Sequence, residues 1–507
     1  MSGSDFGDEE RDRSHEADRS RVEPTSARLG RRKFLFAAGA GLAGCTGAVL
    51  GGSKLFFGSH EADGPEGDDT PGSSTSTQQI EAVDVSGSRS LVCIFLEGGA
   101  DSANIFIPMD NSEQGKSYDA YRKARGNLAV SGSNLLGFGD GKFGFNSGVP
   151  GLSTLASEGR LAVIQNVGPL ARPMTKADFL AKKSIPQSLF AHDAQQKLWQ
   201  TARPDLTSSQ GWGGVVSSAV SRDAEVTPAF SLNGSNIWQS ALEGPYTRLS
   251  PTVSIQRLRG YDASLQASDP RSASIAKVLA RSIELAGSSA NVFERDVADL
   301  INGSIVTTER LQEATAPSDT DEIMADIDGN RLGMQLRLVA RLLKNRENLG
   351  MARQMFFVRM GGWDTHGQQA DRFPVLLAEL DQAVTSFQQA VDELGLSDSV
   401  TTFTASDFGR TLTLNGDGTD HGWGGHSFVF GGAVKGGLYG TFPSYATTNN
   451  PDDTGEAGDS FAGRLIPTTA VCQYGATMAR WMGLQDSQLD VAFPELQNFE
   501  QRDIGFL

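Results

Sequence analysis

The sequence is short of cysteine and of positive charge, and each shortage excludes a class of protein. Its 507 residues hold 44 Lys and Arg against 61 Asp and Glu, a formal net charge of −17. A chain this acidic is not a nucleic-acid binder that neutralises many phosphates. Three cysteines exclude a disulfide framework, and the absence of Cys-x-x-Cys, haem-attachment and dinucleotide motifs leaves a redox protein without support.

The sequence also has no hydrophobic run that is clearly long enough to span a membrane. The best candidate, Phe34–Leu50, has 17 residues and four glycines, whereas a bilayer-spanning helix needs about 20 apolar residues. A long polar stretch and the pair Arg31-Arg32 precede this run, a layout typical of a twin-arginine export signal. We therefore expect the twin-arginine machinery to export the protein to the periplasm or the cell surface.

The residues after the export signal suggest a tether and leave the question of an anchor open. Leu-Ala-Gly-Cys at 42–45 resembles a lipobox, in which Cys45 would be lipidated and would hold the protein at the membrane. In the alternative interpretations, Cys45 is an incidental small residue or the segment is an uncleaved anchor. The polar, Gly-, Ser- and Asp-rich composition that follows predicts disorder. The predicted organisation is a signal with a lipobox at 1–45, a tether at 46–88 and one domain at 89–507.

Continuous apolar runs predict strands that are buried on both faces. Leu91–Leu96 and Leu161–Ile164 are two such runs. A third, at 355–358, is followed by a helix that Pro374 is expected to open, and then by a strand at 400–404. In such a strand–helix–strand unit the two strands should be parallel and should end at the same edge of the sheet.

The fold class expected from this pattern is α/β, a three-layer sandwich with a central, mostly parallel sheet. The chain between 212 and 348 is less regular. It offers helical patterns at 276–300 and 332–343, which we interpret as a helical cap, an insertion or a layer that covers the sheet.

Four of the six histidines lie in or beside short clusters with aspartate. Several clusters follow predicted strands, and the carboxyl ends of strands are where open α/β sheets bind ligands. Carboxylate and imidazole groups suit Zn²⁺, Mn²⁺ or Fe, and no cysteine lies nearby to suggest a thiolate zinc site. Each cluster alone is more typical of a turn, a helix cap or a surface pair than of a metal site, and the metal prediction rests on four histidines lying in such clusters together. The clusters are Asp101, His192-Asp193, Asp364 with His366, Asp407, and Asp420-His421 with His426.

Several motifs together resemble an exported bacterial family, catalogued as domain of unknown function 1501, over residues 91–484. That family is similar in fold to the alkaline phosphatase and sulfatase superfamily, which has a two-metal site at the C-terminal rim of a central sheet. Besides the twin-arginine signal, the motifs are Leu-Glu-Gly-Gly-Ala-Asp-Ser-Ala-Asn at 96–104, Ser-Leu-Phe-Ala-His-Asp-Ala-Gln-Gln at 188–196, Gly-Gly-Trp-Asp-Thr-His at 361–366, Ser-Asp-Phe-Gly-Arg-Thr at 406–411, Asp-His-Gly at 420–422 and Gly-Gly-Ala-Val-Lys-Gly-Gly at 431–437.

The resemblance implies one or two divalent ions, Zn, Mn or Fe, and assigns their ligands. Two departures from the superfamily pattern stand out: Phe408 occupies the place of a ligating histidine, and no nucleophile is identifiable near Ser188. The implied ligands are Asp101 and Asp407 for one metal and Asp364, His366 and either His421 or His426 for the other, with Asn104 and Asp420 supporting them from behind.

The function expected from these patterns is hydrolysis of phosphate or sulfate esters by a metal-dependent enzyme outside the cytoplasm. His192 and Asp193 would transfer protons or hold a substrate oxygen, and Arg410 would contact the anion. The alternative is a non-catalytic cell-surface or assembly protein with a degenerate metal site, which Phe408 and the missing nucleophile favour. The expected partners are the twin-arginine machinery and either a small anionic ester or a cell-surface component, with no nucleic acid.

Overall fold

The computed structural model describes residues 87–220, 227–241, 246–255, 270–455 and 462–507. The predicted export signal at Arg31-Arg32, the lipobox at Cys45 and nearly all of the tether lie outside these ranges. All described residues belong to one compact unit. None of the helices in these ranges is long and apolar enough to cross a bilayer.

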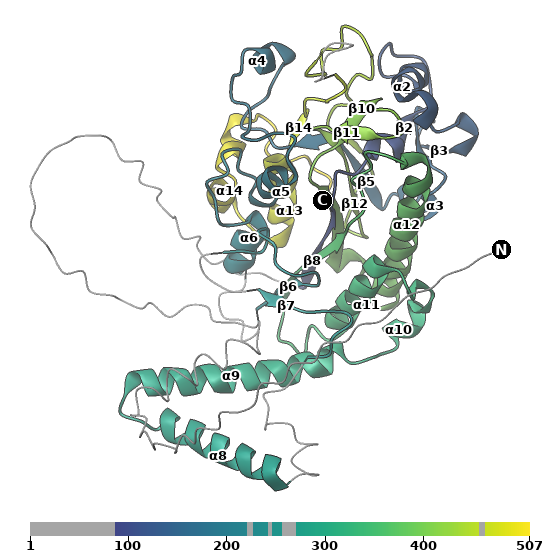
Figure 1. Ribbon diagram of the computed structural model, residues 1–507. Coiled ribbons are helices and arrows are strands. Elements are labelled where there is room, and N and C mark those ends of the chain that lie inside the picture. Colours follow the sequence, from purple (N-terminus) through teal and green to yellow (C-terminus); the bar gives the residue numbers. More distant parts are fainter. Residues whose placement is uncertain (1–86, 221–226, 242–245, 256–269, 456–461) are drawn as a thin grey trace, which may run out of the picture. The chain divides into compact units, whose positions relative to one another are not determined.

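A large mixed sheet forms the middle layer (Figure 1). Its strand order is β13-β5-β12-β9-β1-β8-β6-β7, and β14 also pairs with β5. Only β12 runs antiparallel to its neighbours, β9 and β5, among the described pairs of this sheet. The mostly parallel sheet is thereby confirmed. The bounds are β1 (Arg89–Leu96), β5 (Leu161–Gly168), β6 (Ala229–Ser231), β7 (Thr247–Arg248), β8 (Arg353–Met360), β9 (Val400–Ser406), β12 (Gly425–Phe430), β13 (Gly437–Tyr439) and β14 (Thr469–Ala470).

Two smaller sheets stand beside the large one. One joins β2 (Phe106–Pro108), β4 (Phe143–Asn146) and β3 (Leu135–Phe138), and the other is the antiparallel pair of β10 (Arg410–Leu414) and β11 (Thr419–His421). The second pair is important for the site because it carries Arg410 and His421 opposite each other.

Two hydrophobic cores explain why β1 is apolar at every position after its first two residues. In β1, Val92, Ile94 and Leu96 face one core, while Leu91, Cys93 and Phe95 face the other. Helices cover both faces, which confirms the three layers (Figure 1). The first core contains α3 (Pro150–Ser157), α11 (Arg331–Lys344) and α12 (Gln369–Glu393), and the second contains α5 (His192–Thr201), α6 (Trp212–Val220), α13 (Val471–Met482) and α14 (Asp486–Ala492).

The remaining helices lie outside these two layers or extend them. They are α2 (Tyr118–Arg125), α4 (Lys176–Leu180), α8 (Pro270–Gly287), α9 (Val292–Thr315) and α10 (Thr320–Ile323).

The strand–helix–strand unit brings three strand ends to one level. The strands β8 and β9 are parallel, as predicted, and β1 lies between them. Leu96 at the end of β1 pairs with Met360 on one side and Ser406 on the other. The three loops that follow therefore leave the sheet at the same edge.

Two predicted helix boundaries are wrong. The helix α12 begins at Gln369, five residues before Pro374, because Asp417 anchors its start by accepting the Gln368 N–H at Oδ2 and the Gln369 N–H at its carbonyl oxygen. The single helix expected at 276–300 is two helices, since the chain turns after Gly287 and the Asn291 side chain caps α9. The helix predicted at 332–343 is confirmed as α11.

Candidate metal centre

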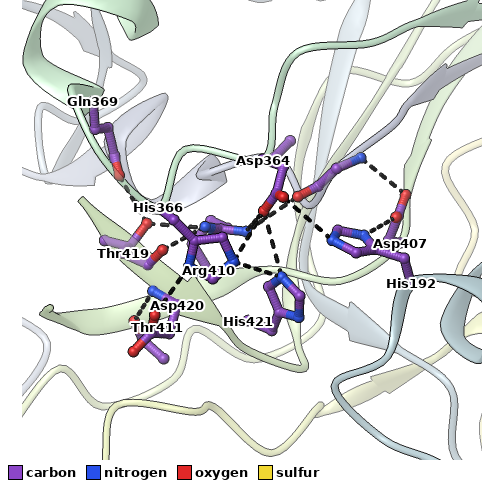
Figure 2. A network of polar contacts seen from close by, with 12 residues as sticks. His192, Asp364, His366, Gln369, Asp407, Arg410, Thr411, Thr419, Asp420 and His421 are labelled. Atoms are coloured by element: carbon purple, nitrogen blue, oxygen red, sulfur yellow. Dashed lines mark hydrogen bonds and ion pairs between the residues drawn. The ribbon is translucent and has the colours of Figure 1, made fainter.

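Asp364 lies at the centre of a cluster of polar side chains at this edge of the sheet (Figure 2). Its Oδ1 accepts a hydrogen bond of 2.8 Å from Arg410 and lies 3.2 Å from His366 Nε2 and 3.4 Å from His421 Nε2. Its Oδ2 lies 3.6 Å from His192 Nε2. Three segments that are far apart in the sequence, around His192, around Asp364 and in the β10–β11 pair, therefore meet at one carboxylate.

Each of the three imidazoles is held through its other ring nitrogen. The Nδ1 atoms contact acceptors: Asp407 Oδ2 at 2.6 Å from His192, Asp420 Oδ1 at 3.0 Å from His366, and the backbone carbonyl of Phe190 at 2.6 Å from His421. Because a carbonyl or carboxylate oxygen can only accept, each Nδ1 carries the hydrogen. The three Nε2 lone pairs of the neutral rings then point toward Asp364.

In these tautomers, hydrogen-bond acceptors of neighbouring side chains face one another. The Nε2 atoms of His366 and His421 are 2.8 Å apart, although neither carries a hydrogen in the tautomers just described. Burial opposes the charge on Asp364, but the hydrogen bond and charge of Arg410 contribute to a net lowering of the pKa of this carboxyl. Burial lowers the pKa of His421, and the nearby positive charge of Arg410 acts in the same direction. The cluster is therefore rich in lone pairs and poor in protons.

A divalent cation fits this donor set. His192, Asp364 and His421 each offer one ligand atom within 4.8 Å of the others, and His366 contacts two of them. Imidazole and carboxylate ligands suit Zn²⁺, Mn²⁺ or Fe. Histidines that bind metals characteristically donate their other N–H to a carboxylate or a backbone carbonyl, as all three do here.

Arg410 and Asp407 support the cluster from behind. The Arg410 side chain is fully buried and donates to Asp364, to the Gly98 carbonyl at 3.2 Å, and to Thr419. Asp407 is buried too and reaches the cluster through His192. In this structure both residues position a neighbour, and the predicted anion contact of Arg410 and metal contact of Asp407 stay predictions.

The Phe408 ring fills the space beside two of the imidazoles. Its centroid lies 4.9 Å from that of His192 and 4.5 Å from that of His421. A side chain at Gly99 would place its Cβ 2.4 Å from the Phe408 ring, and Gly99 also has a φ of +86°. The glycine of the Gly-Gly-Ala-Asp motif is thus required by the packing of the site.

Asp101 does not join the cluster. It is buried, and its two oxygens accept from Arg125 and Gln369. Asn104 lies nearby on the same loop and bonds to Tyr121 and to the Leu128 carbonyl. The predicted metal ligand Asp101 and its supporting residue Asn104 are thus engaged in packing the loop after β1.

His426 is not brought to the cluster either. Its Nδ1 accepts the Asn166 N–H at 3.2 Å, so its Nε2 carries the hydrogen and donates to Tyr445 Oη at 3.0 Å. Of the pair predicted for the Gly-rich loop, only His421 reaches Asp364. Asp193 is exposed on the first turn of α5 and has no hydrogen bond or ion pair to any described residue, whereas Asp420 Oδ1 lies 3.0 Å from His366 Nδ1.

Some members of the site went unnoticed in the sequence. Gln196 donates to Asp407 Oδ2 at 3.1 Å. Its position four residues after His192 on a helix was a usable signal, because such residues share a helix face. The sequence could not indicate the role of the Phe190 carbonyl, because every residue has a backbone carbonyl whatever its side chain.

Burial of His426 predicts a pH-dependent stability. Burial lowers its pKa to about 3, whereas the unfolded chain has an ordinary value near 6.5. As the pH falls through this interval, His426 becomes protonated in the unfolded state but stays neutral in the folded state. The free energy of unfolding therefore drops by up to about 1.4 kcal/mol per pH unit.

Replacing this residue by asparagine (His426→Asn) should remove that contribution, because the amide oxygen takes the place of Nδ1, can still accept the Asn166 N–H and does not titrate. Urea unfolding of both proteins at pH 6.5 and pH 4.5 measures the difference. Parallel loss of stability in the two proteins would exclude His426 as the group responsible.

The comparisons with known proteins agree with the motifs. A family model described as "Protein of unknown function (DUF1501)" matches residues 88–491. The chain belongs to the DUF1501 family. The resemblance stated from the motifs is confirmed over nearly the same range. No curated protein matches this DUF1501 chain in sequence.

This DUF1501 protein is similar to several solved structures at low sequence identity and low TM-score. The lipoteichoic acid synthase LtaP from Listeria monocytogenes is 9% identical, over 75% of this chain and 74% of that one, with a TM-score of 0.28. The C-terminal periplasmic domain of EcEptC from Escherichia coli is 10% identical (83% and 91% covered, TM-score 0.31). The PsFucS1 sulfatase from Pseudoalteromonas sp. is 10% identical (79% and 68% covered, TM-score 0.31).

Proposed function

We propose that this DUF1501 protein is a metal-dependent hydrolase of phosphate or sulfate esters. The observation that carries the proposal is the convergence of three Nδ1-anchored imidazoles on Asp364. Export by the twin-arginine route rests on Arg31-Arg32, and a lipid anchor rests on Cys45. Fractionation of cells into cytoplasm, periplasm and membrane tests both, and protein retained in the cytoplasm would contradict export.

The residues of the cluster divide into metal holders and a proton carrier. Asp364, His366 and His421 would hold one divalent ion, which would supply Lewis-acid polarisation of an ester oxygen and lower the pKa of a water molecule. His192 faces the same point from the opposite side, with Asp407 fixing its Nδ1–H. Its Nε2 can accept a proton from an attacking water, and the Asp407 carboxylate stabilises the imidazolium that forms.

Two arginines border the cluster and suit an anionic ester. Arg372 is exposed and donates to the backbone carbonyls of Gly362 and Asp364. Arg464 donates to the His421 carbonyl and lies over the Phe190 ring. Guanidinium groups bind phosphate-like oxyanions through paired hydrogen bonds. In a chain of net charge −17 this concentration of arginine favours an anionic substrate.

Two glutamine variants test the division of roles. His192→Gln should keep about one equivalent of metal and lose roughly 10²–10⁴-fold in kcat, the usual contribution of a general acid–base group. His366→Gln should lose both metal and turnover, because it removes a ligand. Elemental analysis and hydrolysis of p-nitrophenyl phosphate and p-nitrophenyl sulfate measure the two properties. Loss of metal from His192→Gln would make His192 a ligand, and metal-loaded protein that hydrolyses neither ester would contradict the proposal for this substrate class.

A second candidate is a non-catalytic cell-surface or assembly protein that keeps the fold and a metal. The observation in its favour is that no Ser, Thr or Cys side chain appears among the described polar contacts of Asp364, His192, His366 and His421. Replacing Asp364 and His366 together by alanine separates the candidates. Lost turnover at unchanged thermal stability favours the enzyme, and lost folding favours the structural role.

A further inference from the structure

The helices α8 and α9 form a hairpin that is only partly covered. They pack on each other, and the end of α9 packs on α11 (Figure 1). The hairpin buries few side chains: Ala276 and Ile283 on α8, and Ala298, Leu311 and Ala314 on α9.

Large apolar side chains are concentrated on the outside of this hairpin. Of the twelve large hydrophobic residues exposed in the described ranges, eight lie on these two helices. Val278 and Phe293 are the most exposed of the eight, at 67% and 66%. Scattered exposed apolar residues are ordinary, but a contiguous set marks an interaction surface. The eight residues are Ile275, Val278, Leu285, Val292, Phe293, Val297, Leu300 and Val306.

The spacing of these residues is that of helices packed in a bundle. On α8 the exposed stripe is Ile275, Val278 and Leu285, at intervals of three and seven. On α9 it is Phe293, Val297 and Leu300, at intervals of four and three. These are heptad intervals, and the buried positions Ala276, Ile283 and Ala298 lie on a neighbouring face. Each helix therefore has apolar residues on two faces. One face packs on the other helix of the hairpin, and the second face is exposed.

The charges on the two helices are complementary. The helix α8 has three basic residues and one acidic residue, 3 − 1 = +2, whereas α9 has two basic and five acidic residues, 2 − 5 = −3. Arg281 lies three residues after Val278 and four before Leu285, and Asp296 has the same spacing from Phe293 and Leu300. An antiparallel pairing of α8 with α9 thus places a basic residue beside one stripe and an acidic residue beside the other.

We propose that this hairpin is a dimerisation surface, on which α8 of one copy packs against α9 of a second copy to complete a four-helix bundle. A membrane surface is a poorer occupant, because membrane-surface helices have a basic polar face and this hairpin has a net charge of +2 − 3 = −1. The pairing is self-complementary, as a symmetric dimer requires.

Light scattering on the full-length chain during gel filtration tests the dimer. At micromolar concentration the wild type should show twice the chain mass, and Val278→Glu with Leu300→Glu should show the single mass. Val375→Glu is the matched control, because Val375 is 58% exposed on α12, away from the hairpin. Far-UV circular dichroism shows whether each variant stays folded. A monomeric wild type, or equal loss of the dimer in the control, would overturn the proposal.

A charge exchange tests the orientation of the pairing. Arg281→Asp should weaken the dimer by several-fold in Kd, and adding Asp296→Arg should restore most of the affinity, since the two side chains would again attract. Failure of the second change to restore the dimer would overturn the α8-to-α9 pairing. A monomeric chain that pellets with phosphatidylglycerol vesicles would replace the dimer by a membrane surface, and a monomer that does neither would indicate that the chain itself covers the stripe.

Discussion

Asp364→Asn is expected to lower metal affinity by more than about 100-fold and to abolish ester hydrolysis. Losing a group that merely supports a metal ligand costs about 10–100-fold, and Asp364 is the carboxylate on which the other ligands converge. An asparagine keeps the shape and one oxygen to accept the Arg410 hydrogen bond, so the fold should survive. The substitution removes the negative charge that balances both the bound cation and Arg410.

Asp193→Asn is the matched control for this change, because Asp193, for which the sequence predicted a proton-transfer role, makes no polar contact with the described residues of the Asp364 cluster. Asp193 belongs to the same Asp and His clusters, lies next to His192 and is exposed without polar contacts to described residues. It should retain metal, activity and stability. Elemental analysis after purification, titration with Zn²⁺ and hydrolysis of the two p-nitrophenyl esters measure the effect. If Asp364→Asn and the control bind metal equally well, the cluster is not the metal centre.

The sheet was predictable because its strands are buried on both faces. The sequence of β1 is apolar at all positions except its first two, and a strand with one solvated face would alternate. The strands β6 and β7 at one end of the sheet were missed, since three and two residues carry too little pattern to detect. The start of α12 was misplaced because its anchor, Asp417, lies almost fifty residues further along the chain.

Site residues could be predicted where a short motif identifies them. They could not be predicted where a partner far away in the sequence determines what the side chain contacts. Asp364 and His366 carry the right atoms and follow the end of β8, and His421 carries them at the last position of β11. Asp101 and His426 carry the same atoms, but each is buried against residues that no motif marks. Arg125 is one of several basic residues on an ordinary amphipathic helix, and Tyr445 lies in a loop. Whether a carboxylate or imidazole faces a metal or a buried partner is decided by packing over long sequence distances.

Asp101→Asn should destabilise the fold by about 3–5 kcal/mol, because it leaves the Arg125 guanidinium buried without its carboxylate. Both side chains have no exposed surface. After the change Arg125 would retain only the Thr411 carbonyl, at 2.9 Å, among its described acceptors outside the mutated residue. Metal content should stay unchanged, because neither oxygen of Asp101 faces the Asp364 cluster. Urea unfolding of metal-free protein and elemental analysis measure the two effects separately.

The double variant Asp101→Asn with Arg125→Met decides between a buried ion pair and a metal ligand. If Asp101 serves Arg125, removing both charges should recover much of the lost stability, since an apolar side chain no longer needs a partner in the interior. If Asp101 holds a metal, as the resemblance to phosphatases implied, Arg125→Met cannot rescue the protein. Both variants would then lose metal, and the destabilisation would vanish when the wild type is compared without metal.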